Sequence, residues 1–131
     1  MKNTVFLTFE QVIVVHDDQI QRYNGSHGIH DLSLLESAVM RPQASFGGRY
    51  LYPTLFEKTA AMIHSLVMNH AFVDGNKRTA MVSGIIMLDL NDYKLTVSQE
   101  ELIKTALDVR HGRLDVKSLS QWLKKNCKKI K

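Results

Sequence analysis

Residues 70–80 read HAFVDGNKRTA, and the first nine of them crowd five polar or charged side chains between two long apolar segments. Residues 54–70 (TLFEKTAAMIHSLVMNH) before them and residues 76–91 (NKRTAMVSGIIMLDLN) after them carry apolar side chains at helical spacing. In the second segment the apolar residues cover most of the circumference, which is typical of a helix buried on several sides. We therefore expect two central helices joined by a short connection, residues 72–75 (FVDG).

Two helices are predicted before this pair. Thr8 can cap the first helix, because a threonine hydroxyl accepts a hydrogen bond from a free backbone N–H group of the first turn. Residues 31–40 (DLSLLESAVM) follow as the second helix, with Ser33 and Glu36 at capping-box spacing. This helix is expected to end before Pro42, since the residue that precedes a proline disfavours helical geometry.

Two further helices are predicted after the central pair. Ser98 and Glu101 form a second capping box, and Asp115 can cap the last helix. No segment alternates between apolar and polar residues over several positions, although residues 49–53 (RYLYP) can form a short extended flap before the central helices. The predicted fold is therefore all-α: a compact helical bundle that forms a single domain over residues 1–131.

Length and composition fit a soluble protein. With 131 residues, 44% of them hydrophobic and 23% charged, the chain is expected to bury one ordinary core. It has no apolar run of about 18 residues, so no membrane partner is expected. Thr4, Thr8 and Glu10 interrupt the apolar N-terminal residues, which argues against a signal peptide. The single Cys127 cannot form an internal disulfide, and we expect a cytoplasmic protein.

The positive charge is concentrated at the end of the chain. The net charge is +4, and residues 124–131 (KKNCKKIK) contain no acidic residue. We interpret this segment as a solvated or frayed C-terminus, with a contact surface for an acidic partner as the alternative. Direct nucleic-acid binding is not expected, because no aromatic residues interleave with these lysines as a base-stacking surface requires.

The loop between the central helices has the composition of an anion site. The start of a helix presents free N–H groups and the positive end of the helix dipole, and Lys77 and Arg78 add two charges there. Gly75 permits a backbone conformation with positive φ just before them. Phosphate is the natural ligand, since a guanidinium group such as that of Arg78 can bind two of its oxygens at once.

Two neighbouring side chains extend this site toward phosphate chemistry. Asp74 is a candidate Mg²⁺ ligand, because Mg²⁺ usually takes one or two carboxylates together with phosphate oxygens. His70 is the candidate general base, because an imidazole readily takes a proton near neutral pH. Phe72 is expected to anchor the loop by burying its ring. Each residue alone has an ordinary structural explanation, and their coincidence between two buried helices favours the functional one.

The other histidines show no spacing typical of metal ligands. His64 lies six residues before His70, whereas two metal-binding histidines on one helix are usually four apart. We expect the remaining four to be structural or solvated: His16, His27, His30 and His111.

The stretch HAFVDGNKR (residues 70–78) resembles the signature of the Fic/Doc (Fido) family, roughly His-x-Phe-x-Asp/Glu-Gly/Ala-Asn-Gly/Lys-Arg. Residues 28–48 and 52–67 look like the Doc branch, the death-on-curing toxins of bacterial toxin–antitoxin modules. The resemblance implies a helical bundle with the signature between two central helices. Typical Fic members transfer the AMP part of ATP to a protein hydroxyl, whereas Doc-type toxins transfer the γ-phosphate to a threonine of translation elongation factor Tu and arrest translation.

The resemblance also implies a role for each matching residue. His70 would be the general base, and Asp74 would bind the Mg²⁺ that accompanies ATP. Residues 46–53 would form the flap over which the target peptide lies. The phosphates would be held by four residues of the signature: Gly75, Asn76, Lys77 and Arg78.

Lys77 decides which transfer we expect. Fic members have a glycine there that lets the backbone close around a phosphate, whereas in Doc-like proteins a lysine accompanies a nucleotide that presents its γ-phosphate. Gly75 points the other way, since Doc itself has alanine at this position. We favour a kinase and keep an AMP transferase and a non-catalytic Fic-like binding module as alternatives. A metal nuclease that pairs His70 with Asn76 is disfavoured, because such sites usually place the histidine on a β-hairpin.

The chain lacks the inhibitory pattern that many Fic enzymes carry, Ser/Thr-x-x-x-Glu-Gly/Asn. The nearest match runs from Thr96 to Glu100, and Glu101 then stands where glycine or asparagine is required. Restraint should therefore come from a separate protein. We expect a cognate, Phd-like antitoxin whose disordered segment folds into a groove of this domain.

Overall fold

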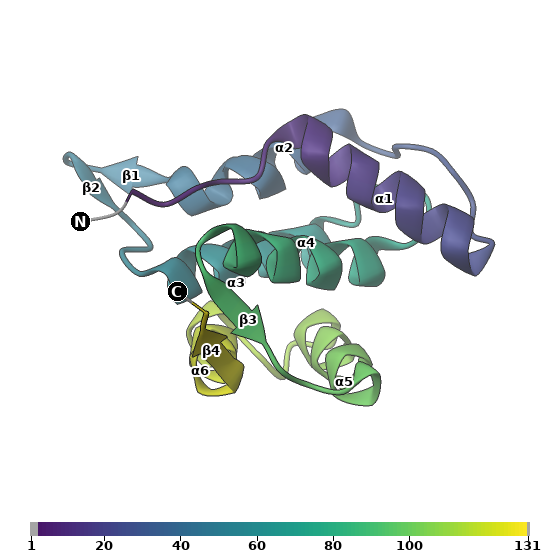
Figure 1. Ribbon diagram of the computed structural model, residues 1–131. Helices are drawn as coiled ribbons and strands as arrows, with labels where there is room; N and C mark the ends of the chain where they lie inside the picture. The colour runs from purple at the N-terminus through teal and green to yellow at the C-terminus, as the bar shows by residue number, and fades with distance from the viewer. Residues whose placement is uncertain (1–2, 131) are drawn as a thin grey trace.

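The computed structural model describes residues 3–130, and the predicted all-α bundle is confirmed there (Figure 1). The N-terminal Met1 and Lys2, and Lys131 of the lysine-rich tail, lie outside the described residues. The α-helices of the described part are α1 Phe9–Tyr23, α2 Leu32–Met40, α3 Leu55–Asn69, α4 Asn76–Leu90, α5 Gln99–Arg110 and α6 Val116–Asn126. A 3₁₀ turn, Arg41–Gln43, follows α2 and contains Pro42. No helix within residues 3–130 is long and apolar enough to cross a membrane.

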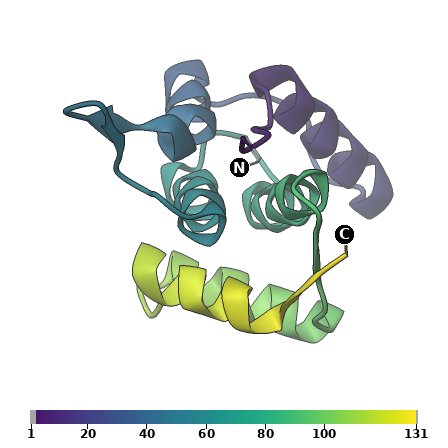
Figure 2. The same cartoon turned by 60° about the vertical axis from the view of Figure 1, so that its left-hand side comes forward.

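The helices are stacked in three layers. Helices α3 and α4 lie side by side in the middle, with α1 and α2 on one side and α5 and α6 on the other (Figure 2). The buried core takes side chains from all six helices, among them Val12, Leu35, Met62, Met87 and Leu119. Because the middle layer is covered on both sides, α4 has to be apolar around most of its circumference, as its sequence predicts.

Most of the predicted helix starts are confirmed. The side chains of Thr8, Ser98 and Asp115 each accept a hydrogen bond from a backbone N–H group of the first turn that follows. The predicted capping box of Ser33 and Glu36 is wrong. Asp31 caps α2 instead, because its carboxylate accepts the N–H of Leu34, and the helix therefore begins before Ser33.

The predicted flap is present as a short hairpin. Strand β1 (Ser45–Phe46) pairs antiparallel with β2 (Arg49–Tyr50), and the hairpin projects from the bundle between α2 and α3 (Figure 2). Its base is tied to α3 by Lys58, whose buried Nζ donates to the carbonyl oxygens of Tyr52 at 2.6 Å and of Pro53 at 3.0 Å. Burial lowers the pKa of this amine.

The expectation of a frayed C-terminus is wrong for the part of the tail that is described. Strand β4 (Cys127–Lys129) pairs antiparallel with β3 (Tyr93–Leu95), so residues 127–129 are held beside the strand that follows α4. The exposed side chains of Lys128 and Lys129 are solvated as expected. Burial raises the pKa of the Cys127 thiol to about 11, so the unreactive thiol form persists at neutral pH.

Candidate functional site

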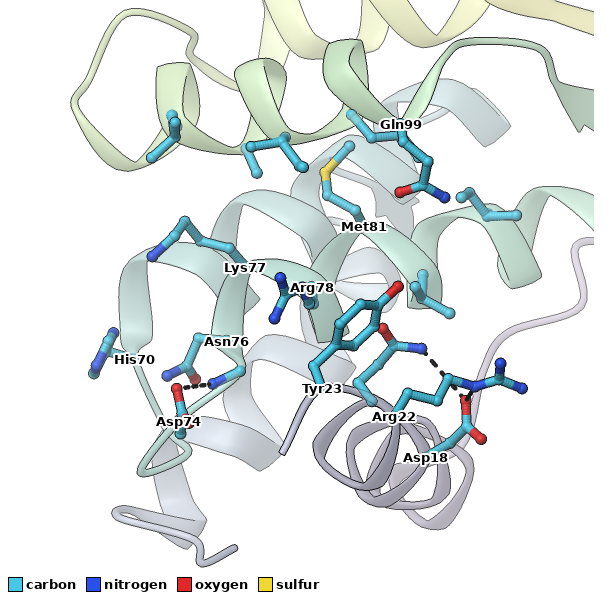
Figure 3. A pocket seen from close by; sticks show the side chains of 18 of the residues that line it. Asp18, Arg22, Tyr23, His70, Asp74, Asn76, Lys77, Arg78, Met81 and Gln99 are labelled. Atoms are coloured by element: carbon cyan, nitrogen blue, oxygen red, sulfur yellow. Dashed lines mark hydrogen bonds and ion pairs between the residues drawn. The ribbon is translucent and has the colours of Figure 1, made fainter. Parts of the chain in front are cut away.

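His70 marks the point where α3 ends and the polar loop begins. It is the C-terminal cap of α3, and its left-handed backbone conformation (φ 50°, ψ 47°) turns the chain out of the helix. This conformation is uncommon for residues other than glycine and recurs at functional sites. The side chain of His70 is exposed and lies at the edge of a cavity (Figure 3).

The loop after His70 is fixed from two sides. Phe72 buries its ring as predicted, with 1% of its surface exposed. The side chain of Asn76 accepts the N–H of Phe72 at 3.0 Å and donates to the Phe72 carbonyl oxygen at 2.9 Å. On the other side, the backbone of residues 28–31 pairs with the loop, with hydrogen bonds from His30 and Asp31 to the carbonyl of Ala71. The loop is therefore a rigid platform.

The N-terminus of α4 is built as an anion site. Within residues 3–130, α4 is the only α-helix that lacks a capping side chain, and its first turn contains no acidic residue. Its N-cap, Gly75, has φ 77°, a conformation that glycine adopts without strain. The exposed side chains of Lys77 and Arg78 add positive charge where the helix dipole is already positive. A bound anion would offset the repulsion between these two side chains and the helix dipole, and it would accept hydrogen bonds from the free N–H groups.

Asp74 faces this helix end as an ionised carboxylate. Its Oδ2 accepts the backbone N–H of Ser26 at 3.0 Å, and its Oδ1 accepts that of Gly75 at 2.9 Å. These two hydrogen bonds, that from Ser26 above all, hold the pKa of the carboxyl below its usual range. The backbone at Gly25 lies so close to this carboxylate that a Cβ on Gly25 would be 2.8 Å from Asp74 Oδ2.

The residues present fit a Mg²⁺ ion that is bound jointly by the protein and by the phosphate oxygens of a ligand. Among residues 3–130, no group of three or more histidine, cysteine or acidic side chains could hold a metal by itself. Mg²⁺ does not need such a group when phosphate oxygens supply most of its ligands. Asp74 offers one carboxylate whose oxygens keep free lone pairs, next to the helix end where an anion is favoured.

The predicted site residues gather around one cavity of about 730 Å³ (Figure 3). This volume lies within the range of about 300–1,000 Å³ that is usual for small-molecule sites. One end of the cavity contains the polar side chains of His70, Asp74, Lys77 and Arg78. Apolar side chains of α4 and α5 form much of the remaining wall, together with the polar side chains of Asp18, Arg22 and Gln99. The guanidinium carbon of Arg78 lies 3.9 Å from the centre of the Tyr23 ring, which places it beside α1.

Asn76 differs from the others in the predicted set. Its side chain is 4% exposed, and both its oxygen and its nitrogen bond to the backbone of Phe72. The structure therefore gives this side chain the task of shaping the loop. Its backbone N–H, at the first position of α4, remains directed toward the anion site together with those of Lys77 and Arg78.

Sequence reasoning missed the contribution of α1. His16 is not solvated: it is buried in the middle of α1, where its Nε2 lies 2.8 Å from the carbonyl oxygen of Asp74. Together with Ile20 and Tyr23 it forms one face of the helix, at spacing i, i+4 and i+7, turned toward the signature loop. The sequence shows this spacing, but it does not show that this face of the helix packs against the signature loop. His64 is half-buried and lies 3.2 Å from the Arg41 side chain.

Comparison with known proteins shows the family of the chain. Residues 6–88 match the sequence profile of the Fic/DOC family. A protein named Toxin Doc from Mycolicibacterium smegmatis is 45% identical over 73 residues, and the match spans 56% of this chain and 56% of that relative. A protein named Protein kinase doc from Escherichia phage P1 is 31% identical over 116 residues, which are 88% of this chain and 90% of that relative. The chain belongs to the Fic/DOC family.

Proposed function

We propose that this chain is a Doc-type toxin that transfers the γ-phosphate of ATP to a threonine hydroxyl of translation elongation factor Tu and so arrests translation in the cytoplasm. One observation carries the proposal: the uncapped, positively charged start of α4 faces an ionised Asp74 and an exposed His70 around a single cavity. Similarity to proteins named Toxin Doc and Protein kinase doc supports the choice of toxin and of kinase.

The residues divide the reaction between them. The imidazole of His70 takes the proton of the threonine hydroxyl while the hydroxyl oxygen forms its bond to the γ-phosphorus. The bond from that phosphorus to the bridging oxygen breaks, and ADP leaves with the electron pair. The N–H groups of α4 and the side chains of Lys77 and Arg78 stabilise the charge on the transferred phosphoryl group. Mg²⁺, held by Asp74, supplies further charge neutralisation when it is bound.

Labelled ATP distinguishes this reaction from AMP transfer. The purified chain is incubated with elongation factor Tu and with ATP that carries its label on either the γ- or the α-phosphorus. We expect elongation factor Tu to acquire label from the γ-position alone. Label from the α-position would show AMP transfer, and absence of both with an intact fold would favour a binding module or another target.

Asp74→Asn tests the proposed metal ligand. Loss of a hydrogen-bonding partner beyond the direct ligands of a metal typically weakens its affinity about 10–100-fold, so loss of a direct ligand should raise the Mg²⁺ concentration for half-maximal transfer at least about tenfold. The amide keeps the shape, but its single oxygen can accept only one of the two N–H groups, of Ser26 and of Gly75, that the carboxylate accepts. Asp89→Asn, at an exposed position near the other end of α4, is the matched control. An unchanged Mg²⁺ dependence in Asp74→Asn would remove Asp74 from the metal site.

The cavity also offers a site for the proposed antitoxin. Its α5 wall exposes apolar side chains, with Ile103 53% and Leu107 37% exposed, next to the polar end of the cavity. An antitoxin segment that folds there would cover the α5 wall and prevent ATP from entering the cavity. Co-expression with the neighbouring reading frame should rescue growth and yield a complex, and Ile103→Asp should weaken that complex. Neither rescue nor complex formation would count against an antitoxin from that frame.

A further inference from the structure

We propose that His16 is a positioning residue for the anion site: its Nε2–H group fixes the peptide between Asp74 and Gly75 and thereby aims the Asp74 carboxylate. The inference rests on the anion and metal site of the proposed function, in which Asp74 takes part. It concerns a residue of α1 that lies 58 positions before Asp74 in the sequence.

The hydrogen bond has a defined direction. His16 Nε2 lies 2.8 Å from the carbonyl oxygen of Asp74. A carbonyl oxygen can only accept, so the hydrogen must be on Nε2. The imidazole is 2% exposed and lies parallel to the buried Phe72 ring, with the ring centres 3.7 Å apart and an angle of 5° between the planes. The donor is therefore held in place and shielded from water, which would otherwise compete for the carbonyl.

The peptide that receives this bond carries the Gly75 N–H on its other side. In a planar trans peptide the carbonyl and the N–H point in opposite directions, and no cis peptide occurs among residues 3–130. Fixing the Asp74 carbonyl toward His16 therefore directs the Gly75 N–H away from α1. That N–H donates to Asp74 Oδ1 at 2.9 Å, while Ser26 holds Oδ2. The side-chain orientation of Asp74 thus depends on the orientation of its own peptide.

Gly75 explains why an outside donor is needed. A glycine tolerates conformations on both sides of φ 0°, so the Asp74–Gly75 peptide could rotate at little cost if nothing held it. Rotation would withdraw the Gly75 N–H from Asp74 Oδ1 and leave the carboxylate held by the Ser26 N–H alone. The space around Gly75 is closed by the same helix, since a Cβ there would lie 3.0 Å from Ile20 Cδ1 and 3.8 Å from His16.

Two substitutions separate the hydrogen bond from the packing. His16→Gln places an amide N–H near the position of Nε2 but removes the ring, whereas His16→Phe keeps a ring that can stack on Phe72 but has no donor. The test uses the backbone amide NMR signals of residues 75–78 and titration with inorganic pyrophosphate. We expect His16→Phe to shift these signals and to weaken pyrophosphate binding about tenfold, and His16→Gln to restore most of both.

The kinetics of phosphate transfer provide a second, independent test of the role of His16. If His16 acts through Asp74, His16→Phe raises the Mg²⁺ and ATP concentrations needed for half-maximal rate. His16→Gln, with a Tm similar to that of His16→Phe, brings these concentrations back toward those of the unaltered protein. A purely structural residue would lower Tm in both variants and leave these concentrations unchanged. Equal effects of the two substitutions on residues 75–78, or no effect of either, would overturn the proposal.

One measurement needs no substitution and does not depend on the proposed reaction. Nitrogen NMR of the histidine rings in the unaltered protein reports which ring nitrogen of His16 carries hydrogen. We expect the hydrogen on Nε2, and a neutral ring protonated at Nδ1 alone would overturn the inference even if both variants unfold. Failure of the unaltered protein to bind pyrophosphate would instead count against the anion site, while the ring tautomer would still decide the role of His16.

Discussion

His70→Ala is expected to lower the rate of phosphate transfer about 100- to 10,000-fold, which in most assays is a complete loss. The variant removes the group that takes the hydroxyl proton, while the N–H groups and charges of α4 remain in place. The fold should survive, because the His70 side chain is exposed and contributes nothing to the core. Transfer to elongation factor Tu and Tm, measured on the same preparation, test both parts.

The backbone of His70 requires a second variant as control. His70 already adopts the left-handed conformation (φ 50°), which histidine tolerates better than alanine, so His70→Ala should lower stability slightly for a backbone reason alone. Asparagine tolerates this conformation and cannot act as a base, so His70→Asn should be inactive at nearly unchanged Tm. Activity retained in both variants would show that another group takes the proton. A large drop of Tm in both would make His70 a structural residue.

Lys77→Gly is expected to reduce phosphate transfer about 10- to 100-fold, since a hydrogen bond to a charged group contributes about 1.5–3 kcal/mol. Lys77 is exposed at the second position of α4, and its side chain lines the polar end of the cavity. Glycine there removes the charge and gives the backbone room to close around a phosphate. If Lys77 sets the orientation of the nucleotide, the variant should gain measurable AMP transfer, detected with ATP labelled on the α-phosphorus.

Lys77→Ala separates charge from backbone. Alanine also removes the ammonium group but favours the helix, whereas glycine costs up to about 1 kcal/mol in a helix interior. We expect both variants to lose phosphate transfer and only the glycine variant to gain AMP transfer. Full phosphate transfer by Lys77→Ala would mean that the lysine does not contact the transferred group, and the preference for a kinase would lose its main residue-level support.

The sequence predicts well what depends on neighbours along the chain. The helical periodicity of the two central segments and the caps at Thr8, Ser98 and Asp115 are local properties, and the structure confirms them. The error at α2 shows the limit of local reasoning. Asp31 and Ser33 are both good N-caps, and the choice falls on Asp31 because its own N–H is bound to the Ala71 carbonyl, 40 residues away in the sequence.

The parts that were missed depend on contacts between distant segments. Strand β4 exists because β3 offers it a partner, and a three-residue strand leaves almost no pattern in a lysine-rich tail. His16 belongs to no recognisable sequence motif. Its contacts with Asp74 and Phe72 follow from the packing of α1 against the signature loop. The signature predicted which residues line the cavity, but not that Asn76 would use its side chain to hold Phe72.

Intact-mass spectrometry of elongation factor Tu tests the proposed function most directly. The purified factor is incubated with this chain, ATP and Mg²⁺, and a parallel sample contains the His70→Ala variant. We predict that the factor gains the mass of one phosphate with the unaltered chain and gains nothing with the variant. A gain of AMP, a phosphate gain that persists with His70→Ala, or an unchanged mass with a correctly folded chain would each contradict the proposal.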